Sequence, residues 1–116
     1  MVKRGVTGAR YGIVDWLAQR LTAVVMLAYS AFLGVRLWLS PELDFAAWRA
    51  LFAPVWMRHA TLLFMVALCW HAWVGMRDIY MDYLRSTGLR LAAHALTILL
   101  LLAYLLWAAG ILWGRP

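Results

Sequence analysis

Charged residues are scarce in this sequence, and their scarcity excludes most soluble folds. Only 14% of the 116 residues are charged, whereas 66% are hydrophobic. A water-soluble domain of this size would have too little polar surface to cover its core. A single cysteine, Cys69, excludes an internal disulfide framework and a thiolate metal cluster held by this chain alone. The sequence also lacks a nucleotide-binding or flavin-binding motif, which argues against an enzyme that works by itself.

Acidic residues are the other shortage. Five Asp and Glu stand against eleven Lys and Arg, which gives a net charge of +6. The cations are scattered between apolar runs and form no patch, so we expect no nucleic-acid partner. No acidic residue lies well inside an apolar run, as one usually does in a proton-coupled transporter. The pattern is typical of a small polytopic membrane protein with its cations at helix ends and in loops.

Three apolar runs are long enough to cross a bilayer, since a hydrocarbon core of roughly 30 Å requires about 20 apolar residues in a helix. The sequence predicts spanning helices at about 16–39, 59–80 and 91–113. We find no repeat, low-complexity segment or linker, and therefore expect residues 1–116 to form a single all-α transmembrane domain. The beginning is unlike a secretory signal peptide, because the first apolar run starts only near Trp16.

The distribution of Lys and Arg predicts the orientation in the membrane. Three spans place the two ends of the chain on opposite sides. One side then carries Lys3, Arg4, Arg10, Arg20, Arg77, Arg85 and Arg90. The other side carries Arg36, Arg49, Arg58 and Arg115. Because the side richer in cations faces inward, we expect a cytoplasmic amino terminus and a periplasmic carboxy terminus.

A short helix is predicted between the first two runs. Asp44 is placed to cap it and Pro54 to end it. Between them, large apolar side chains recur at helical spacing: Phe45, Trp48, Leu51 and Phe52. We expect this helix to lie along the outer membrane surface.

The second apolar run has the most informative face. At 100° per residue, Gly75, Asp78 and Asp82 fall within about 40° of His71, and Ala67 lies on the same side. A histidine in an apolar helix needs a partner, which can be a hydrogen bond to another helix, a proton path or a metal. Haem iron is one such metal, and small neighbours would leave room for the porphyrin. Spacing alone leaves both packing and ligation open.

Two further histidines enter this question, because one histidine cannot hold a bis-histidine haem by itself. His94, in the third run, is a second candidate ligand within the chain, or it makes a hydrogen bond near the inner interface. His59 lies at the outer edge, and we interpret it as an interfacial residue.

An acid and a phenol follow at the inner end of the second run. Asp82 directly precedes Tyr83, and Arg77 and Arg85 lie nearby. A phenol beside a carboxylate is able to donate a hydrogen bond to a quinone carbonyl and to relay a proton to it. The same residues also suit an interfacial tyrosine anchor and an aspartate paired with arginine. The residues alone leave both interpretations open.

The run His-Ala-Trp-Val-Gly-Met at residues 71–76, followed by Asp82-Tyr83 and Leu-Arg-Leu at 89–91, resembles the hydrophobic anchor D chain of bacterial succinate dehydrogenase. The resemblance covers nearly the whole chain, including Asp15 and Arg20 near the start of the first span. It implies a heterodimeric, haem-binding helical bundle formed with a sister C chain in the bacterial inner membrane. In such a complex a flavoprotein subunit oxidises succinate and an iron-sulfur subunit delivers electrons to ubiquinone, which links the tricarboxylic acid cycle to the respiratory chain.

The resemblance also implies roles for single residues. His71 would be one axial ligand of the haem b iron, and a histidine of the C chain, rather than His94, would be the other. Tyr83 would hydrogen-bond a carbonyl oxygen of ubiquinone, with Asp82 as a supporting residue. Arg20 would pair with a haem propionate, a contact that suits a guanidinium.

Two alternatives accompany this interpretation. The close one is the anchor subunit of a quinol-fumarate reductase, which differs in the favoured direction of electron flow and in the quinone used. The distant one is a small membrane transporter or assembly protein without a redox role.

Overall fold

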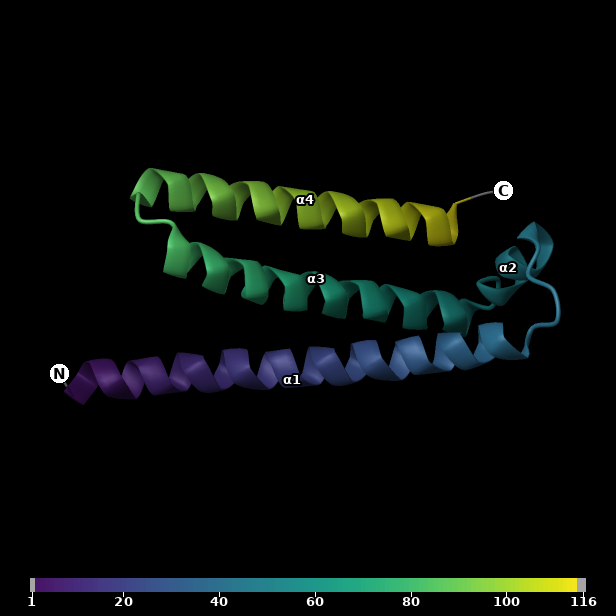
Figure 1. Ribbon diagram of the computed structural model, residues 1–116, viewed down its shortest axis with the longest axis horizontal. Helices are drawn as coiled ribbons and strands as arrows, with labels where there is room; N and C mark the ends of the chain where they lie inside the picture. The colour runs from purple at the N-terminus through teal and green to yellow at the C-terminus, as the bar shows by residue number, and fades with distance from the viewer. Residues whose placement is uncertain (1, 115–116) are drawn as a thin grey trace.

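The computed structural model describes residues 2–114, with side chains from residue 12 onward. Within that range it consists of four helices: α1 (Val2–Leu39), α2 (Phe45–Leu51), α3 (Val55–Tyr83) and α4 (Thr87–Trp113). The three long helices are antiparallel to one another in turn, so that α1 begins at one end of the bundle and α4 ends at the other (Figure 1). The predicted all-α architecture is confirmed.

Three helices are long and apolar enough to cross a membrane, with candidate spans at Gly12–Leu39, Val55–Tyr83 and Thr87–Trp113. The number and order of the predicted spans are therefore correct, but the helices are longer than the apolar runs. α1 begins at Val2 rather than near residue 16, and α3 extends four residues earlier and three later than 59–80. Apolar length measures only the part suited to lipid, whereas a helix continues through polar residues because its amides still pair internally.

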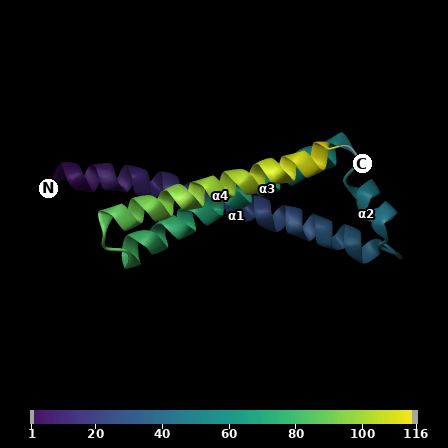
Figure 2. The same cartoon turned by 90° about the horizontal axis from the view of Figure 1, so that it is seen from above.

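α3 is the central helix, since it packs against both α1 and α4. α4 runs alongside α3, whereas α1 crosses the pair at a clear angle (Figure 2). Among the described residues only Met57, Ala67 and Val74 are buried, and all three belong to α3. The bundle thus exposes most of its apolar side chains, as a protein surrounded by lipid or by other membrane chains does.

α2 confirms the predicted short helix in the first loop. Asp44 is its N-cap, and its carboxylate accepts a hydrogen bond from the Ala47 N–H at 2.8 Å. The helix ends at Leu51, before Pro54, which is the N-cap residue of α3 instead of the terminator of α2. A proline is tolerated there because the first backbone N–H groups of a helix have no internal partner.

The turn between α3 and α4 is held by two sets of hydrogen bonds. The Arg90 guanidinium donates to the backbone carbonyls of Leu84 and Met81. These contacts serve carbonyl groups that the end of a helix leaves without internal partners. One turn farther in, the hydroxyls of Tyr80 and Thr97 lie 2.7 Å apart and join the two helices.

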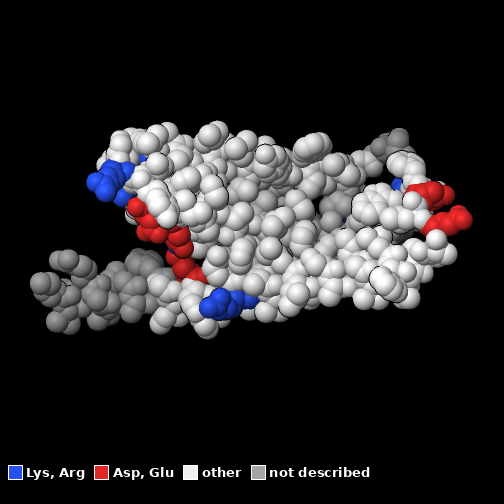
Figure 3. Space-filling model, viewed as in Figure 1, with Lys and Arg blue, Asp and Glu red and all other residues white. Residues whose placement is uncertain are grey.

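On the face shown in Figure 3, charged side chains lie at the two ends and, on the lower edge, part of the way in from the left end, and the rest of that face is uncharged. This distribution agrees with three helices that cross an apolar layer. The side chains of Lys3, Arg4 and Arg10, and all of Arg115, lie outside the described residues. The cytoplasmic placement of the amino terminus therefore stays a prediction.

Candidate functional site

His71 lies in the apolar middle of α3 and is held by a residue of α1. Its Nδ1 lies 2.9 Å from the Thr22 hydroxyl oxygen. That hydroxyl also reaches back along its own helix, to the carbonyl oxygens of Ala18 at 2.8 Å and Gln19 at 3.1 Å. Nε2 of His71 makes no hydrogen bond to any residue that the structure describes. Within the described chain, the imidazole is thus fixed through one ring nitrogen only.

Two small residues, one helical turn to either side of His71, set the space beside it. Ala67 is 5% exposed and is used in packing within the bundle. At Gly75, by contrast, an added Cβ atom would meet nothing within 4 Å. The room predicted for a flat ligand therefore lies on the Gly75 side, toward the turn between α3 and α4.

His94 lies on the opposite side of α3. Its ring centroid is 5.4 Å from that of Trp73 and 5.7 Å from that of Tyr80. Around the axis of α3, these two residues are about 160° and about 180° from His71. Nε2 of His94 is buried without a hydrogen-bond partner in the described part of the chain. This geometry argues against His94 as the second ligand of an iron bound by His71.

Asp82 and Tyr83 occupy the last turn of α3, which continues unbroken to Tyr83. Tyr83 is therefore about 120° around the helix from His71. Tyr83 is 78% exposed and Asp82 is exposed, and among residues 12–114 neither side chain has a hydrogen-bond partner. Tyr80, one turn earlier, has its hydroxyl paired with Thr97. The phenol and carboxylate at the end of α3 are thus available to a ligand or to another chain.

Arg20 lies on α1 two residues before Thr22, a rise of about 3 Å. Its guanidinium carbon is 5.1 Å from the centroid of the Trp16 ring, a cation–π contact. The side chain is exposed and forms no ion pair with an acidic residue in the described range. Arg20 therefore presents an uncompensated positive charge close to the level of the His71 contact.

An ion pair between α1 and α3 escaped the sequence analysis. Arg77 donates to the Asp15 carboxylate at 2.6 Å and to that of Asp78 at 3.4 Å. Asp15 and Arg77 are far apart in the sequence, so no local pattern relates them. The available signal was the rarity of acidic side chains near an apolar span, because such a group usually pairs.

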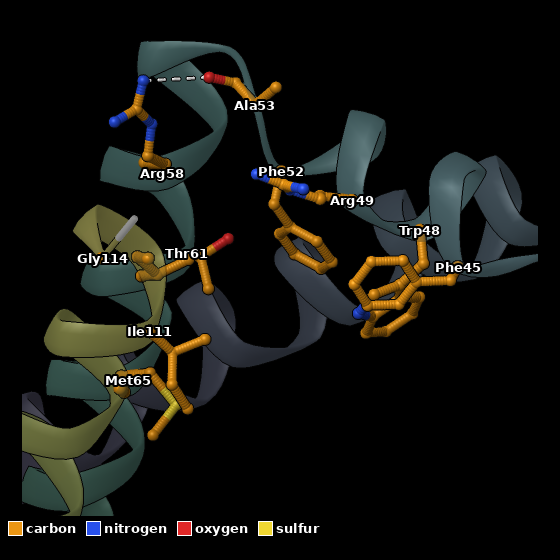
Figure 4. Close-up of a pocket in the computed structure, with 12 residues that line it drawn as sticks. Phe45, Trp48, Arg49, Phe52, Ala53, Arg58, Thr61, Met65, Ile111 and Gly114 are labelled. Atoms are coloured by element: carbon orange, nitrogen blue, oxygen red, sulfur yellow. Dashed lines mark hydrogen bonds between the residues drawn. The ribbon is translucent and has the colours of Figure 1, made fainter. Parts of the chain in front are cut away.

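A cavity of about 570 Å³ lies toward the other end of the bundle, between α2, α3 and α4. Figure 4 shows Phe45 and Trp48 on its α2 side and Met65 and Ile111 on the side of the long helices. Met65 precedes His71 by six residues, about 9 Å along α3. This cavity is separate from the space at Gly75 and from the exposed end of α3.

Nearly the whole length of the chain matches a known family. The family described as succinate dehydrogenase/fumarate reductase transmembrane subunit matches residues 2–112. This chain belongs to that family. The succinate dehydrogenase hydrophobic membrane anchor subunit of Coxiella burnetii is 38% identical over 105 residues, which cover 90% of this chain and 91% of the relative. The resemblance drawn from the sequence is confirmed: the chain is a multi-pass membrane anchor subunit with three spans.

Proposed function

We propose that this anchor subunit, together with a sister C chain, holds a haem b and helps form the ubiquinone site of a bacterial succinate dehydrogenase. The flavoprotein and iron-sulfur subunits are its further partners, and succinate oxidation belongs to them. The observation that carries the proposal is the state of His71: Nδ1 is fixed by Thr22, Nε2 has no hydrogen-bond partner in the described chain, and open space lies at Gly75.

The residues present fit a haem shared with another chain. Within residues 2–114, no three His, Cys, Asp or Glu side chains come together to hold a metal ion. A haem iron needs only one ligand from each of two chains, and Nε2 of His71 is suited to be one of them. Arg20 would neutralise a propionate with its unpaired guanidinium. The bound haem supplies a one-electron couple within the membrane.

Tyr83 and Asp82 would serve the quinone. The phenol donates a hydrogen bond to a carbonyl oxygen of ubiquinone, which stabilises negative charge as the ring is reduced. The adjacent carboxylate accepts a proton from water and passes it toward that oxygen. The support for this assignment is that both groups are exposed at the end of an apolar helix, where a quinone reaches them from lipid and protons reach them from water.

The test of haem binding is the reduced-minus-oxidised optical spectrum of the purified complex. We expect a b-type haem signal in the wild type and its loss in His71→Ala, with the anchor subunit still inserted in the membrane. An unchanged spectrum in His71→Ala would refute the ligand role.

The proposed placement is the bacterial inner membrane, with the amino terminus in the cytoplasm. A topology reporter fused after Pro116 should then report the periplasm, and one inserted at residues 85–88 should report the cytoplasm. The reverse result would overturn the proposed orientation.

A fumarate reductase anchor is the second candidate, because the family description covers both enzymes. The two are distinguished by turnover of the purified complex in each direction. Faster succinate oxidation with ubiquinone supports the first assignment, and faster fumarate reduction with a low-potential quinol supports the second.

A further inference from the structure

We infer that Thr22 is a positioning residue for the haem: it holds His71 in the tautomer that leaves Nε2 free for iron, and it orients the ring. The inference rests on the proposed role of His71 as an axial ligand. Its evidence is the contact of 2.9 Å between Thr22 Oγ1 and His71 Nδ1, which joins α1 to α3.

The direction of this hydrogen bond follows from the contacts of the threonine. A hydroxyl has one proton to donate and two lone pairs that accept. The hydroxyl donates its hydrogen bond to the backbone carbonyl oxygens of Ala18 and Gln19, which lie 2.8 Å and 3.1 Å from Thr22 Oγ1. The oxygen therefore offers a lone pair to His71, and Nδ1 carries the proton that it donates.

A neutral imidazole with its proton on Nδ1 has its lone pair on Nε2, which is the atom that must bind iron. Partners of this kind, which hold the second nitrogen of a ligand histidine, fix the ring orientation and raise its basicity. In the apolar part of a span there is little water to replace such a partner. Among the described residues, Thr22 is the group that supplies it.

Thr22 is itself held in place before a ligand arrives. Its hydroxyl is anchored on its own helix, and α1 is fixed against α3 by further contacts on either side. Toward one end, Arg77 pairs with Asp15, and toward the other the hydroxyls of Tyr29 and Thr61 meet at 2.5 Å. The acceptor for Nδ1 is thus part of the helix crossing and not of a mobile loop.

The decisive variant is Thr22→Val, which keeps the shape of the side chain and removes the acceptor. In the purified intact complex we expect the affinity for haem to fall about tenfold, a typical effect of losing such a partner. The haem that remains should show a higher midpoint potential, because a less basic imidazole stabilises the oxidised iron less. Its low-spin electron paramagnetic resonance signal should also shift, since the ring plane is no longer fixed.

Two variants separate this role from a general loss of packing. Thr22→Ser restores the hydroxyl and should restore the potential and the resonance signal. Thr97→Val removes a threonine hydroxyl that pairs with Tyr80, across the other interface of α3. Because that site is on the side away from His71, Thr97→Val should leave the haem potential and signal unchanged.

If the complex with Thr22→Val does not assemble, Thr22→Cys should cause the same changes in haem potential and resonance signal, because sulfur is only a weak hydrogen-bond acceptor. A potential and resonance signal equal to those of the wild type, in either variant, would overturn the inference. If His71→Ala loses its haem and the Thr22 variant is unchanged, only the role of Thr22 is rejected, and the proposed function stands. Retention of haem in His71→Ala rejects the proposed function on which it rests.

Discussion

His71 and His94 lie on opposite sides of α3, and the two imidazoles are held in different ways. His71 is held by a hydrogen bond between its Nδ1 and the Thr22 hydroxyl of α1, and its second nitrogen has no partner in the described chain. His94 is packed against the rings of Trp73 and Tyr80, with Nε2 buried and without a partner in that range. Partial burial in an apolar helix is common to both. What separates a candidate ligand from a packed histidine is therefore the partner of its other nitrogen.

The last two turns of α3 repeat this contrast with tyrosines. Tyr80 has its hydroxyl paired with Thr97, whereas Tyr83 is exposed and its hydroxyl has no partner among the described residues. A phenol that is already paired within the chain stabilises helix packing. A phenol without such a partner is available to a ligand, and the ligand proposed above is ubiquinone. The roles proposed for His71 and Tyr83 can therefore be tested against a residue of the same type on the same bundle, His94 and Tyr80 respectively.

The largest expected effect contrasts the two histidines. His71→Leu should abolish the b-type haem signal of the purified complex. His94→Leu should leave it in place, because His94 packs against Trp73 and Tyr80 on the side of α3 away from His71 and from the space at Gly75. Haem content is measured from the reduced-minus-oxidised spectrum relative to total protein. Loss of haem in both variants, with the complex intact, would show that the comparison of their surroundings does not identify the ligand.

The next effect contrasts the two tyrosines. Tyr83→Phe should lower ubiquinone reduction about tenfold, the consequence of losing a hydrogen bond of roughly 1.4 kcal/mol in the transition state. Succinate oxidation measured with an artificial acceptor should be unchanged. Tyr80→Phe is the matched control, since it removes a hydroxyl that Thr97 already satisfies. Equal losses in both assays for Tyr83→Phe would indicate an assembly role instead.

A smaller effect concerns the crossing of α1 and α3. Arg77→Gln should destabilise the complex by up to about 1 kcal/mol, because the Arg77–Asp15 pair is partly exposed. The quantity to measure is the midpoint of thermal dissociation, in a double-mutant cycle with Asp15→Asn. Additive effects of the two substitutions would mean that the pair contributes no coupling between the helices.

The smallest effect is confined to α2. Asp44→Ala removes the N-cap contact with Ala47 and should destabilise this helix by about 1 kcal/mol. Hydrogen exchange of the amides at 45–51 should become faster, with the haem spectrum and quinone reduction unchanged. Unaltered exchange would show that packing, and not the cap, holds α2 in place.

Much of the fold was predictable because bilayer thickness and helical periodicity act locally. The three spans and the capped helix after Asp44 follow from apolar length and residue type. The pairing of Thr22 with His71, and of Asp15 with Arg77, depends on how α1 crosses α3. Side-chain period within one helix carries no information about that crossing. A polar residue inside each apolar run was the available sign that the runs meet there.

The roles of His71, Arg20, Tyr83 and Asp82 are predictions that depend on molecules outside this chain. The sequence identified the residues because histidine, arginine and an exposed acid–phenol pair stand out in an apolar chain. It did not identify Thr22, because a threonine in a membrane helix commonly bonds back to its own backbone. Here the Thr22 hydroxyl bonds back to the Ala18 carbonyl oxygen and also contacts His71 Nδ1.

Met57, Ala67 and Val74 are the only buried side chains that the structure describes, so this bundle has almost no interior of its own. Surrounding lipid and neighbouring subunits must take the place of a core. A copy that has not assembled with its partner subunits would then be poorly protected from membrane proteases, and its lifetime in the cell would depend on how much of those subunits is made. Substitutions on its outer faces should accordingly alter how much complex accumulates before they alter the rate of any single electron-transfer step.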